Sequence, residues 1–230
     1  MEILTNNAVL IALTFIVFLL ARMFQKRTGW VVLNPILITI AILIAFLKIT
    51  GIDYDTYASA GSTIDFWLKP AIVALGVPLY ERLRTIRQQF WAILASQFVG
   101  CLVGIISVVL TARLMGASPE VIVSLAPKSV TTPIAMEVCR STGGIPSLTA
   151  AIVVCVGLFG AVCGFKVLQL GRVRGSIAQG LSMGTASHAV GTSRAMEKDE
   201  EAGAYASLGL IINGVLTAIF TPFILSLMGI

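Results

Sequence analysis

The sequence has 230 residues, of which 57% are hydrophobic and only 12% are charged, and its mean hydropathy is +0.95. A soluble domain typically has about 25% charged residues, so the composition excludes an ordinary soluble protein and predicts one integral membrane domain over residues 1–230. The net charge of +5 would suggest nucleic acid as a partner of a soluble protein, but in a membrane chain it orients the spans, and we expect no nucleic-acid partner.

Six segments are apolar enough to be membrane spans, since a helix needs about 20 residues to cross a bilayer. The first is too long for a signal peptide, and no small-residue cleavage site follows it, so we expect a retained span. The third is the poorest, because Lys69, Pro70, Gly76 and Pro78 interrupt it. The predicted spans cover residues 7–24, 31–49, 64–80, 89–112, 145–165 and 202–230.

Two further segments, residues 118–144 and 175–200, are too polar for lipid-facing helices and are rich in Gly, Ser, Thr and Pro. They are either long external loops or hairpins that enter the membrane and line a cavity. Basic residues mark cytoplasmic turns, and if the turns after the first, third and fifth spans are all cytoplasmic, both segments re-enter. Those turns contain Arg22, Lys26, Arg27, Arg82, Arg84, Arg87, Lys166, Arg172 and Arg174.

An internal repeat connects the two polar segments. Residues 129–164 align without gaps onto residues 189–224, with nine identical positions in 36, including Thr132/Thr192, Ala135/Ala195, Met136/Met196 and Glu137/Glu197. Each unit is a polar hairpin followed by a span. Because one span separates the hairpins, re-entrant copies would be inverted, as in secondary transporters.

The repeat defines the predicted fold. We expect an all-α polytopic membrane protein with about six transmembrane helices and two re-entrant, discontinuous hairpins that form an inverted repeat. Residues 1–117 supply the N-terminal spans, and residues 118–230 supply the hairpin-plus-span repeat.

Three strings, "LAPKSVTTPIAMEV", "GGIPSLTA" and "MGTASHAVGTSRA", resemble signature segments of the LrgB/CidB family of bacterial membrane proteins. The similarity extends through "NPILITI", "KPAIVALGVPLYE" and "LMGASPE". The resemblance implies a multi-pass protein of the bacterial inner membrane. It also implies one of two functions: a holin- or antiholin-like regulator of murein hydrolase activity and cell lysis, beside a smaller LrgA/CidA-type partner, or a carrier of small carboxylates. Pyruvate is implied for some bacterial members, and glycolate and glycerate for a plastid relative.

Residues of the two polar segments are the candidate site. Lys128 would neutralise a carboxylate at membrane depth, or it would reach the interface from a hairpin mouth. Pro133 is expected to stop a regular helix, so that free N–H groups and hydroxyls bind the anion. His188 titrates near neutral pH. The predicted substrate-binding residues are Lys128, Ser129, Thr131, Thr132, Pro133, Thr185, Ser187, His188, Thr192 and Arg194.

Other polar residues have structural explanations that require no substrate, such as ion pairing or helix packing. Glu137 and His188 are the candidates for proton coupling, although Glu137 and Glu197 would equally neutralise Arg140 and Arg194. A lone histidine predicts no metal site, and Asn213 is expected to make an ordinary helix-packing hydrogen bond.

The functional prediction is secondary transport of a small monocarboxylate by alternating access, with proton coupling. The alternative is the holin- or antiholin-like regulator. We expect a homodimer or larger homo-oligomer, and neither an enzyme nor a cofactor, because no nucleophile–base pair, metal cluster or nucleotide loop is visible in the sequence.

Overall fold

The structure is a computed structural model that describes residues 5–28, 35–74, 80 and 83–230. Every regular element in these ranges is a helix. The chain divides into two compact units, Met1–Gly76 and Val77–Ile230.

The first unit contains α1 (Asn7–Thr28), α2 (Pro35–Thr50) and α3 (Tyr54–Ala74), and α1 contacts both of the others. The buried residues of α1 are Leu10, Val17 and Ala21, which lie along one face of the helix. The opposite face of α1 is strongly apolar and exposed, as expected for a surface that meets lipid rather than water. It includes Phe15, Leu19 and Met23, with exposed fractions of 54%, 52% and 54%.

Helix α3 differs from the predicted span. It begins at Tyr54 rather than at residue 64, and it continues through Pro70 to Ala74. Its first turn is polar, with the Asp53 carboxylate accepting a hydrogen bond from the Asp55 amide at 3.1 Å, so an N-terminal cap starts the helix where hydropathy is low. The predicted breaks at Gly76 and Pro78 lie outside the described residues.

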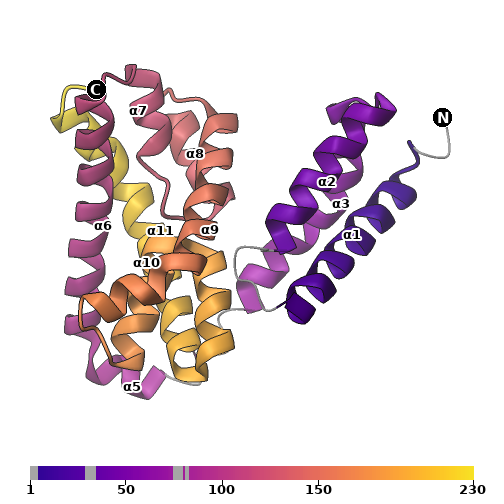
Figure 1. Ribbon diagram of the computed structural model, residues 1–230. Coiled ribbons are helices and arrows are strands. Elements are labelled where there is room, and N and C mark those ends of the chain that lie inside the picture. The colour runs from indigo at the N-terminus through magenta and orange to yellow at the C-terminus, as the bar shows by residue number, and fades with distance from the viewer. Residues whose placement is uncertain (1–4, 29–34, 75–79, 81–82) are drawn as a thin grey trace. The chain divides into compact units, whose positions relative to one another are not determined.

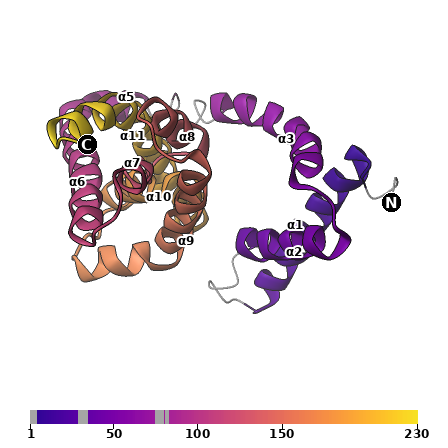
Figure 2. The same ribbon diagram turned by 90° about the horizontal axis from the view of Figure 1, so that it is seen from above.

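The second unit contains the remaining helices. Its short helix α5 (Leu83–Gln88) lies at one end and the α7–α8 region at the other (Figure 1), and we call these the α5 end and the α7 end. Viewed from above in Figure 2, α7 lies between α6 and α9, and it contacts both. The other helices are α6 (Phe90–Leu114), α7 (Pro119–Leu125), α8 (Thr132–Ser141), α9 (Pro146–Leu170), α10 (Ser176–Lys198) and α11 (Glu200–Leu227).

Four of the described helices, α1, α6, α9 and α11, are long and apolar enough to cross a membrane, and α2 contains a shorter apolar helix. These elements confirm an all-helical membrane protein.

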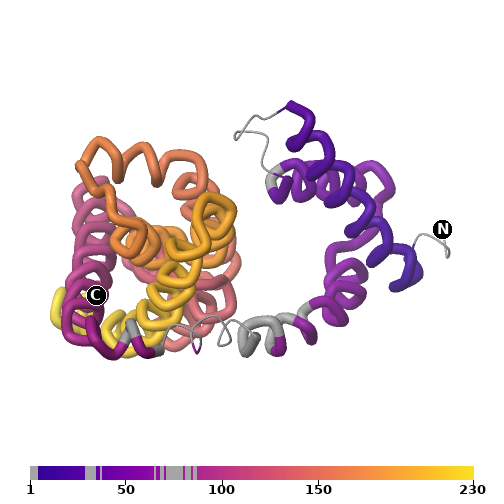
Figure 3. Tube along the Cα trace, turned by 90° about the horizontal axis from the view of Figure 1, so that it is seen from below, coloured from indigo at the N-terminus to yellow at the C-terminus, as the bar shows by residue number. Residues whose placement is uncertain are grey.

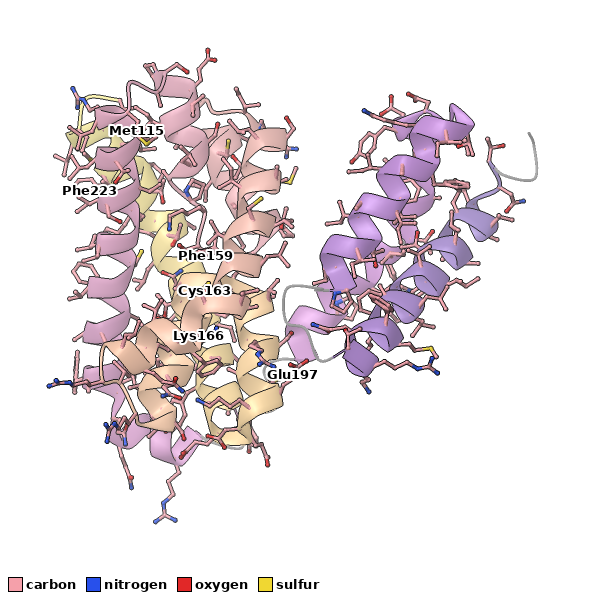
Figure 4. All side chains as sticks on the ribbon, in the orientation of Figure 1. Met115, Phe159, Cys163, Lys166, Glu197 and Phe223 are labelled. Atoms are coloured by element: carbon pink, nitrogen blue, oxygen red, sulfur yellow. The ribbon has the colours of Figure 1, made fainter. Side chains whose placement is uncertain are left out.

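The long helices of the second unit run between its two ends. Figure 4 shows Met115, after α6, and Phe223, on α11, toward the α7 end, whereas Lys166 on α9 and Glu197 on α10 lie toward the α5 end. The guanidinium of Arg113 donates to the Met228 carbonyl at 3.1 Å and ties the ends of α6 and α11 together. Helices α6 and α11 therefore run in one direction and α9 runs in the other.

Helices α7 and α8, with the irregular residues 126–131 between them, form the first hairpin. The Ser124 hydroxyl donates to the Glu120 carbonyl at 2.6 Å and accepts from the Ile145 amide at 2.7 Å. The Thr149 hydroxyl donates to the Ser124 carbonyl at 2.9 Å. The bonds to Ile145 and Thr149 join α7 to the start of α9, so the hairpin leaves the α7 end and returns to it.

Helix α10 forms the second hairpin. Ser187 and His188 have non-helical backbone angles and divide it into a first arm, residues 176–186, and a second arm, residues 189–198. The Lys198 ammonium donates to the Gln179 side chain at 2.8 Å, so the two arms fold back against each other. Figure 3 shows from below that orange α10 lies beside the yellow-orange start of α11.

Glycines allow the first arm of α10 to approach α11 closely. A Cβ atom at Gly180 or Gly184 would collide with the backbone of Ala202 or Ala206, respectively. Small residues permit such backbone contact between membrane helices. The paired order of these contacts makes the first arm run parallel to α11, from the α5 end toward the middle of the unit.

Candidate functional site

The tip of the first hairpin is the irregular segment 126–131, and the tip of the second is the break at Ser187 and His188. The two tips meet at Asn213, in the middle of α11. The Asn213 amide nitrogen donates to the Ser129 carbonyl of the first tip at 3.3 Å and to the Thr185 carbonyl, beside the second tip, at 3.0 Å. The Asn213 side chain is only 1% exposed. Two segments that are 56 positions apart in the sequence therefore converge on one buried amide.

The tip of the second hairpin also contacts α9, through His188. His188 Nε2 lies 2.8 Å from the Val153 carbonyl oxygen of α9. A carbonyl only accepts hydrogen bonds, so Nε2 must carry the proton in this contact. The His188 ring also lies against Gly157, where a Cβ atom would be 2.7 Å from Nε2.

The contacts of Asn213 with the first tip and of His188 with α9 are related by the 60-residue register of the sequence repeat. The register places Lys128 onto His188 and Val153 onto Asn213. The first tip bonds to α11, the span of the second repeat, and the second tip bonds to α9, the span of the first. Each tip is thus positioned by the span of the other repeat.

A cavity of about 630 Å³ lies beside the meeting point, between α6, the first arm of α10, α11 and the first tip. It runs from Gln89 and Gly175 at the α5 end to the tips in the middle of the unit. Lys128 is the one charged residue among the described residues that line it. The other polar lining residues near the tips are Gln97, Ser129, Ser182, Thr185, Asn213 and Thr217.

A second cavity of about 570 Å³ lies on the α9 side of the first arm of α10. Phe159, Gly160 and Ser187 are among its lining residues, and Figure 4 marks Phe159 on α9. Lys128, Ser182 and Ala186 line both cavities. Lys128 therefore lies where the two cavities approach each other around the arm.

The electrostatics of this place favour an anion. Lys128 Nζ donates to the Ser129 hydroxyl at 3.1 Å, and the two ion pairs found among the described residues involve other side chains. A charge at membrane depth without a counter-charge costs several kcal/mol. The Thr185 hydroxyl contacts both the Gln97 side chain and the Leu181 carbonyl. Its single proton can be donated to only one of them, and in either arrangement the Gln97 amide brings a donor N–H group to this cavity.

The structure gathers part of the predicted set. Lys128, Ser129 and Thr185 line the first cavity, and Ser187 lines the second. His188 is buried at the second tip. Thr192 is buried one turn later, where its hydroxyl donates to the His188 carbonyl at 2.9 Å. The Thr131 hydroxyl is buried and makes no hydrogen bond with the described residues.

Pro133 has a different role from the predicted one. It lies in the first turn of α8, directly after Thr132, and it is exposed. Proline suits the first turn because that position needs no amide hydrogen bond. The residue therefore begins a helix instead of stopping one.

Two predicted residues lie on exposed surfaces. Glu137 pairs with Arg140 at 3.1 Å, and Arg194 pairs with Glu197 at 3.0 Å. The Glu137 and Glu197 side chains are 75% and 67% exposed, and no member of either pair lines the two cavities. A role for Glu137 in proton coupling and for Arg194 in binding stays a prediction.

Sequence reasoning missed Gln97 and Ser182, and it assigned Asn213 only to packing. Gln97 is 3% exposed in the otherwise apolar middle of α6. A polar side chain inside a confident span was the available signal. Within the part of the chain that the structure describes, no three His, Cys, Asp or Glu side chains gather as a metal site.

Comparison with known proteins assigns the chain to a family. Residues 14–227 match the model of the LrgB-like family. The holin-like protein CidB of Staphylococcus aureus is 36% identical over 218 residues, 95% of each chain. An uncharacterized protein of Haemophilus influenzae is 41% identical over 215 residues, 94% of this chain and 93% of its own.

A third relative, the uncharacterized protein YwbG of Bacillus subtilis, is 36% identical over 216 residues, 94% of this chain and 96% of its own. No solved structure matches the chain. The family match and these near full-length relatives agree with the four long apolar helices, and the chain therefore belongs to the LrgB-like family of membrane proteins.

Proposed function

We propose that this protein carries a small monocarboxylate, such as pyruvate or glycolate, across the bacterial inner membrane by alternating access. The observation that carries the proposal is the position of Lys128. It is a cation without a carboxylate partner among the described residues, and it lies on the first hairpin tip at the place where two cavities approach each other. A bound carboxylate would supply the missing counter-charge.

The neighbouring groups suit a small acid. The Gln97 amide and the Ser129 hydroxyl offer donors beside Lys128, which match carboxylate oxygens. The rest of the lining is largely apolar and includes Ile93, Ile105 and Leu181. A few polar groups in a mostly apolar cavity of several hundred Å³ are typical of small-molecule sites.

Charge placement supports an orientation for this transport. Arg84, Arg87, Arg172 and Arg174 are exposed at or near the α5 end, which makes that end cytoplasmic by the positive-inside rule. The first hairpin then re-enters from outside and the second from the cytoplasm, as an inverted repeat. The first cavity reaches the tips from the cytoplasmic end, and alternating access would close it while opening a path toward the α7 end.

His188 is the better placed candidate for proton coupling. It is buried at the second tip, whereas Glu137 is exposed in an ion pair. In the contact with Val153 its Nε2 carries a proton, so Nδ1 is the nitrogen that would accept another. Coupling through His188 predicts uptake that follows an imposed pH gradient.

The second candidate function is a holin-like regulator of murein hydrolase activity or export and of cell lysis. The observation that favours it is the name of the Staphylococcus aureus relative, the holin-like protein CidB. That function would make the protein an oligomer whose activity depends on an LrgA/CidA-type partner. A homodimer or larger assembly is compatible with both candidates.

Uptake assays in liposomes distinguish the two functions. Purified protein is reconstituted and tested with labelled pyruvate, labelled glycolate and a larger uncharged solute. A carrier gives saturable uptake of the acids and excludes the larger solute. Unsaturable leak of all three compounds, or activity only with a partner chain, would overturn the carrier proposal and support the holin-like one.

A further inference from the structure

Asn213 occupies a position that its assignment to helix packing does not explain. Its amide nitrogen has two hydrogen-bond acceptors, the carbonyl oxygens of Ser129 and Thr185, and these belong to different hairpins. A packing hydrogen bond needs only one neighbour. This side chain joins three segments at one point, and that point is in the wall of the first cavity.

The orientation of the amide follows from these contacts. Both partners are carbonyl oxygens, which only accept, so the NH₂ group must face them and Oδ1 must point elsewhere. Oδ1 is buried and accepts no hydrogen bond from the described residues. Buried polar atoms normally have a partner, so the geometry also leaves an acceptor beside the cavity for a donor group of its occupant or for water.

The repeat provides an internal comparison. At the position equivalent to Asn213, α9 has Val153, whose backbone carbonyl contacts His188 at 2.8 Å. A backbone carbonyl is present whatever the side chain is, whereas the contact of Asn213 depends entirely on its amide. Each contact therefore joins one side chain to one main-chain carbonyl, but for the first tip that side chain belongs to the span, whereas for the second tip it belongs to the tip itself.

We propose that Asn213 is a positioning residue, which fixes the two hairpin tips against each other so that Lys128 and Thr185 face the same occupant of the first cavity. The transport consequence rests on the proposed carrier function, but the attachment of the tips does not. Without the amide, the first tip keeps its helices but loses its bond to α11. Lys128 is then no longer fixed relative to the Gln97–Thr185 pair.

Thiol cross-linking tests the attachment without any substrate. In a background with all four cysteines replaced by alanine, Ser129→Cys and Ala186→Cys place one thiol on each tip, and Ala186 leaves the Thr185 bond to Gln97 intact. We expect a short bifunctional thiol reagent to join them at least about tenfold more slowly in Asn213→Ala and Asn213→Asp than in the background, because a buried hydrogen bond is worth roughly one such factor. Asn213→Asp keeps the size of the side chain but removes the NH₂ group that contacts both carbonyls.

The matched control is Thr221→Val. Thr221 lies two turns further along the same face of α11, is fully buried, and lines neither cavity. Its substitution should leave the cross-linking rate unchanged. An equal rate in Asn213→Ala and in the background, with both proteins monodisperse and of similar melting temperature, would overturn the proposal.

Uptake gives the second measurement, in protein with its native cysteines. We expect Asn213→Ala to raise the KM for the labelled acid about tenfold, whereas Thr221→Val leaves it unchanged. Slower cross-linking together with an unchanged KM would overturn the positioning role. Slower cross-linking in a protein that takes up no acid in any form would refute the carrier function and leave the attachment of the tips established.

Discussion

The two hairpins come from one repeated sequence unit but are built differently. The first has two separate helices joined by irregular residues 126–131, whereas the second is one helix broken only at Ser187 and His188. Pro133 lies at the start of α8, and the equivalent Ser193 lies inside α10 with an amide that can continue a helix. The repeated sequence therefore accounts for the helical arms that the two hairpins share, whereas single residues such as Pro133 account for the different structures of their tips.

Equivalent positions in the arms do behave alike. Ala135 and Ala195 are both completely buried, and Glu137 and Glu197 are both exposed in ion pairs with an arginine three residues away. Such exposed pairs contribute little to stability. The common pattern is therefore one of burial: the alanine faces the protein and the glutamate faces away.

The arms differ in how neighbouring elements secure them. Ser124 joins the first hairpin to the start of α9 through two hydrogen bonds, one accepted by its hydroxyl from the Ile145 amide and one accepted by its carbonyl from the Thr149 hydroxyl. The second hairpin lies against α11 through glycines, with the Gly184 backbone touching that of Ala206. One hairpin depends on a polar group and the other depends on the absence of side chains, and this difference can be tested directly.

The largest expected effect concerns the tips. Lys128→Ala should reduce the uptake kcat/KM of a labelled acid by about 100-fold, because it removes the charge that pairs with the carboxylate in a desolvated site. Lys166→Ala is the matched control, because Lys166 is exposed on α9 and lines neither cavity. His188→Ala at the equivalent tip should cost less. An equal loss in both tip variants would mean that the tips are functionally equivalent.

The arms give the next largest effect. Gly184→Val should reduce the free energy of unfolding by about 2–3 kcal/mol, since its Cβ would collide with the Ala206 backbone and overpacking typically costs this much. Ser124→Ala in the first hairpin should cost about 1–2 kcal/mol, because it leaves the Ile145 amide without its acceptor. Denaturation in detergent measures both variants.

The control for the glycine is Gly104→Ala on α6, where an added Cβ meets nothing within 4 Å. This change should be neutral or slightly stabilising, because alanine favours helix over glycine. If Gly184→Val is as stable as Gly104→Ala, the close approach of the second hairpin to α11 does not contribute to stability.

Much of the fold could be predicted from the sequence, because long apolar helices have an unmistakable composition. The four long helices and the two polar segments follow from hydropathy, and the register of 60 residues follows from the repeat. The start of α3 did not follow, because a polar first turn at Tyr54 and Asp55 is invisible to hydropathy. Helix initiation there depends on a local cap.

The site was less accessible to sequence reasoning. Lys128, Ser129 and Thr185 could be predicted, because charges and hydroxyls are conspicuous in a membrane chain. Asn213 and Gln97 could not, because an isolated amide in a span reads as packing until its neighbours are known. What gives Asn213 its importance is the convergence of two distant tips, and that is a property of the fold.

A smaller effect tests the backbone of the tips. His188 has φ 41° and ψ −138°, a conformation that is strained for any residue with a side chain, and no such angle occurs at Lys128. His188→Gly should therefore be more stable than His188→Ala by about 1–2 kcal/mol, since both lose the imidazole but only glycine relieves the strain. Lys128→Gly should instead be no more stable than Lys128→Ala. The same order at both tips would contradict the difference in their backbones.

The smallest effect concerns the exits from the hairpins. The second hairpin leaves through Asp199, which caps α11 by accepting from the Glu201 and Ala202 amides, whereas Ile145 at the start of α9 has no capping side chain of its own. A hydrogen bond from Ser176 chiefly, assisted by these amides, lowers the pKa of the Asp199 carboxyl below its usual value. Because the folded-state pKa is the lower one, the charged cap stabilises the protein at neutral pH, and this contribution is lost as the pH falls through the folded-state value.

Asp199→Asn should lower the melting temperature by about 2 °C at pH 7 and should have no effect once the carboxyl is protonated in the folded protein. A constant difference across this pH range would mean that the carboxylate charge is irrelevant and that shape alone makes the cap.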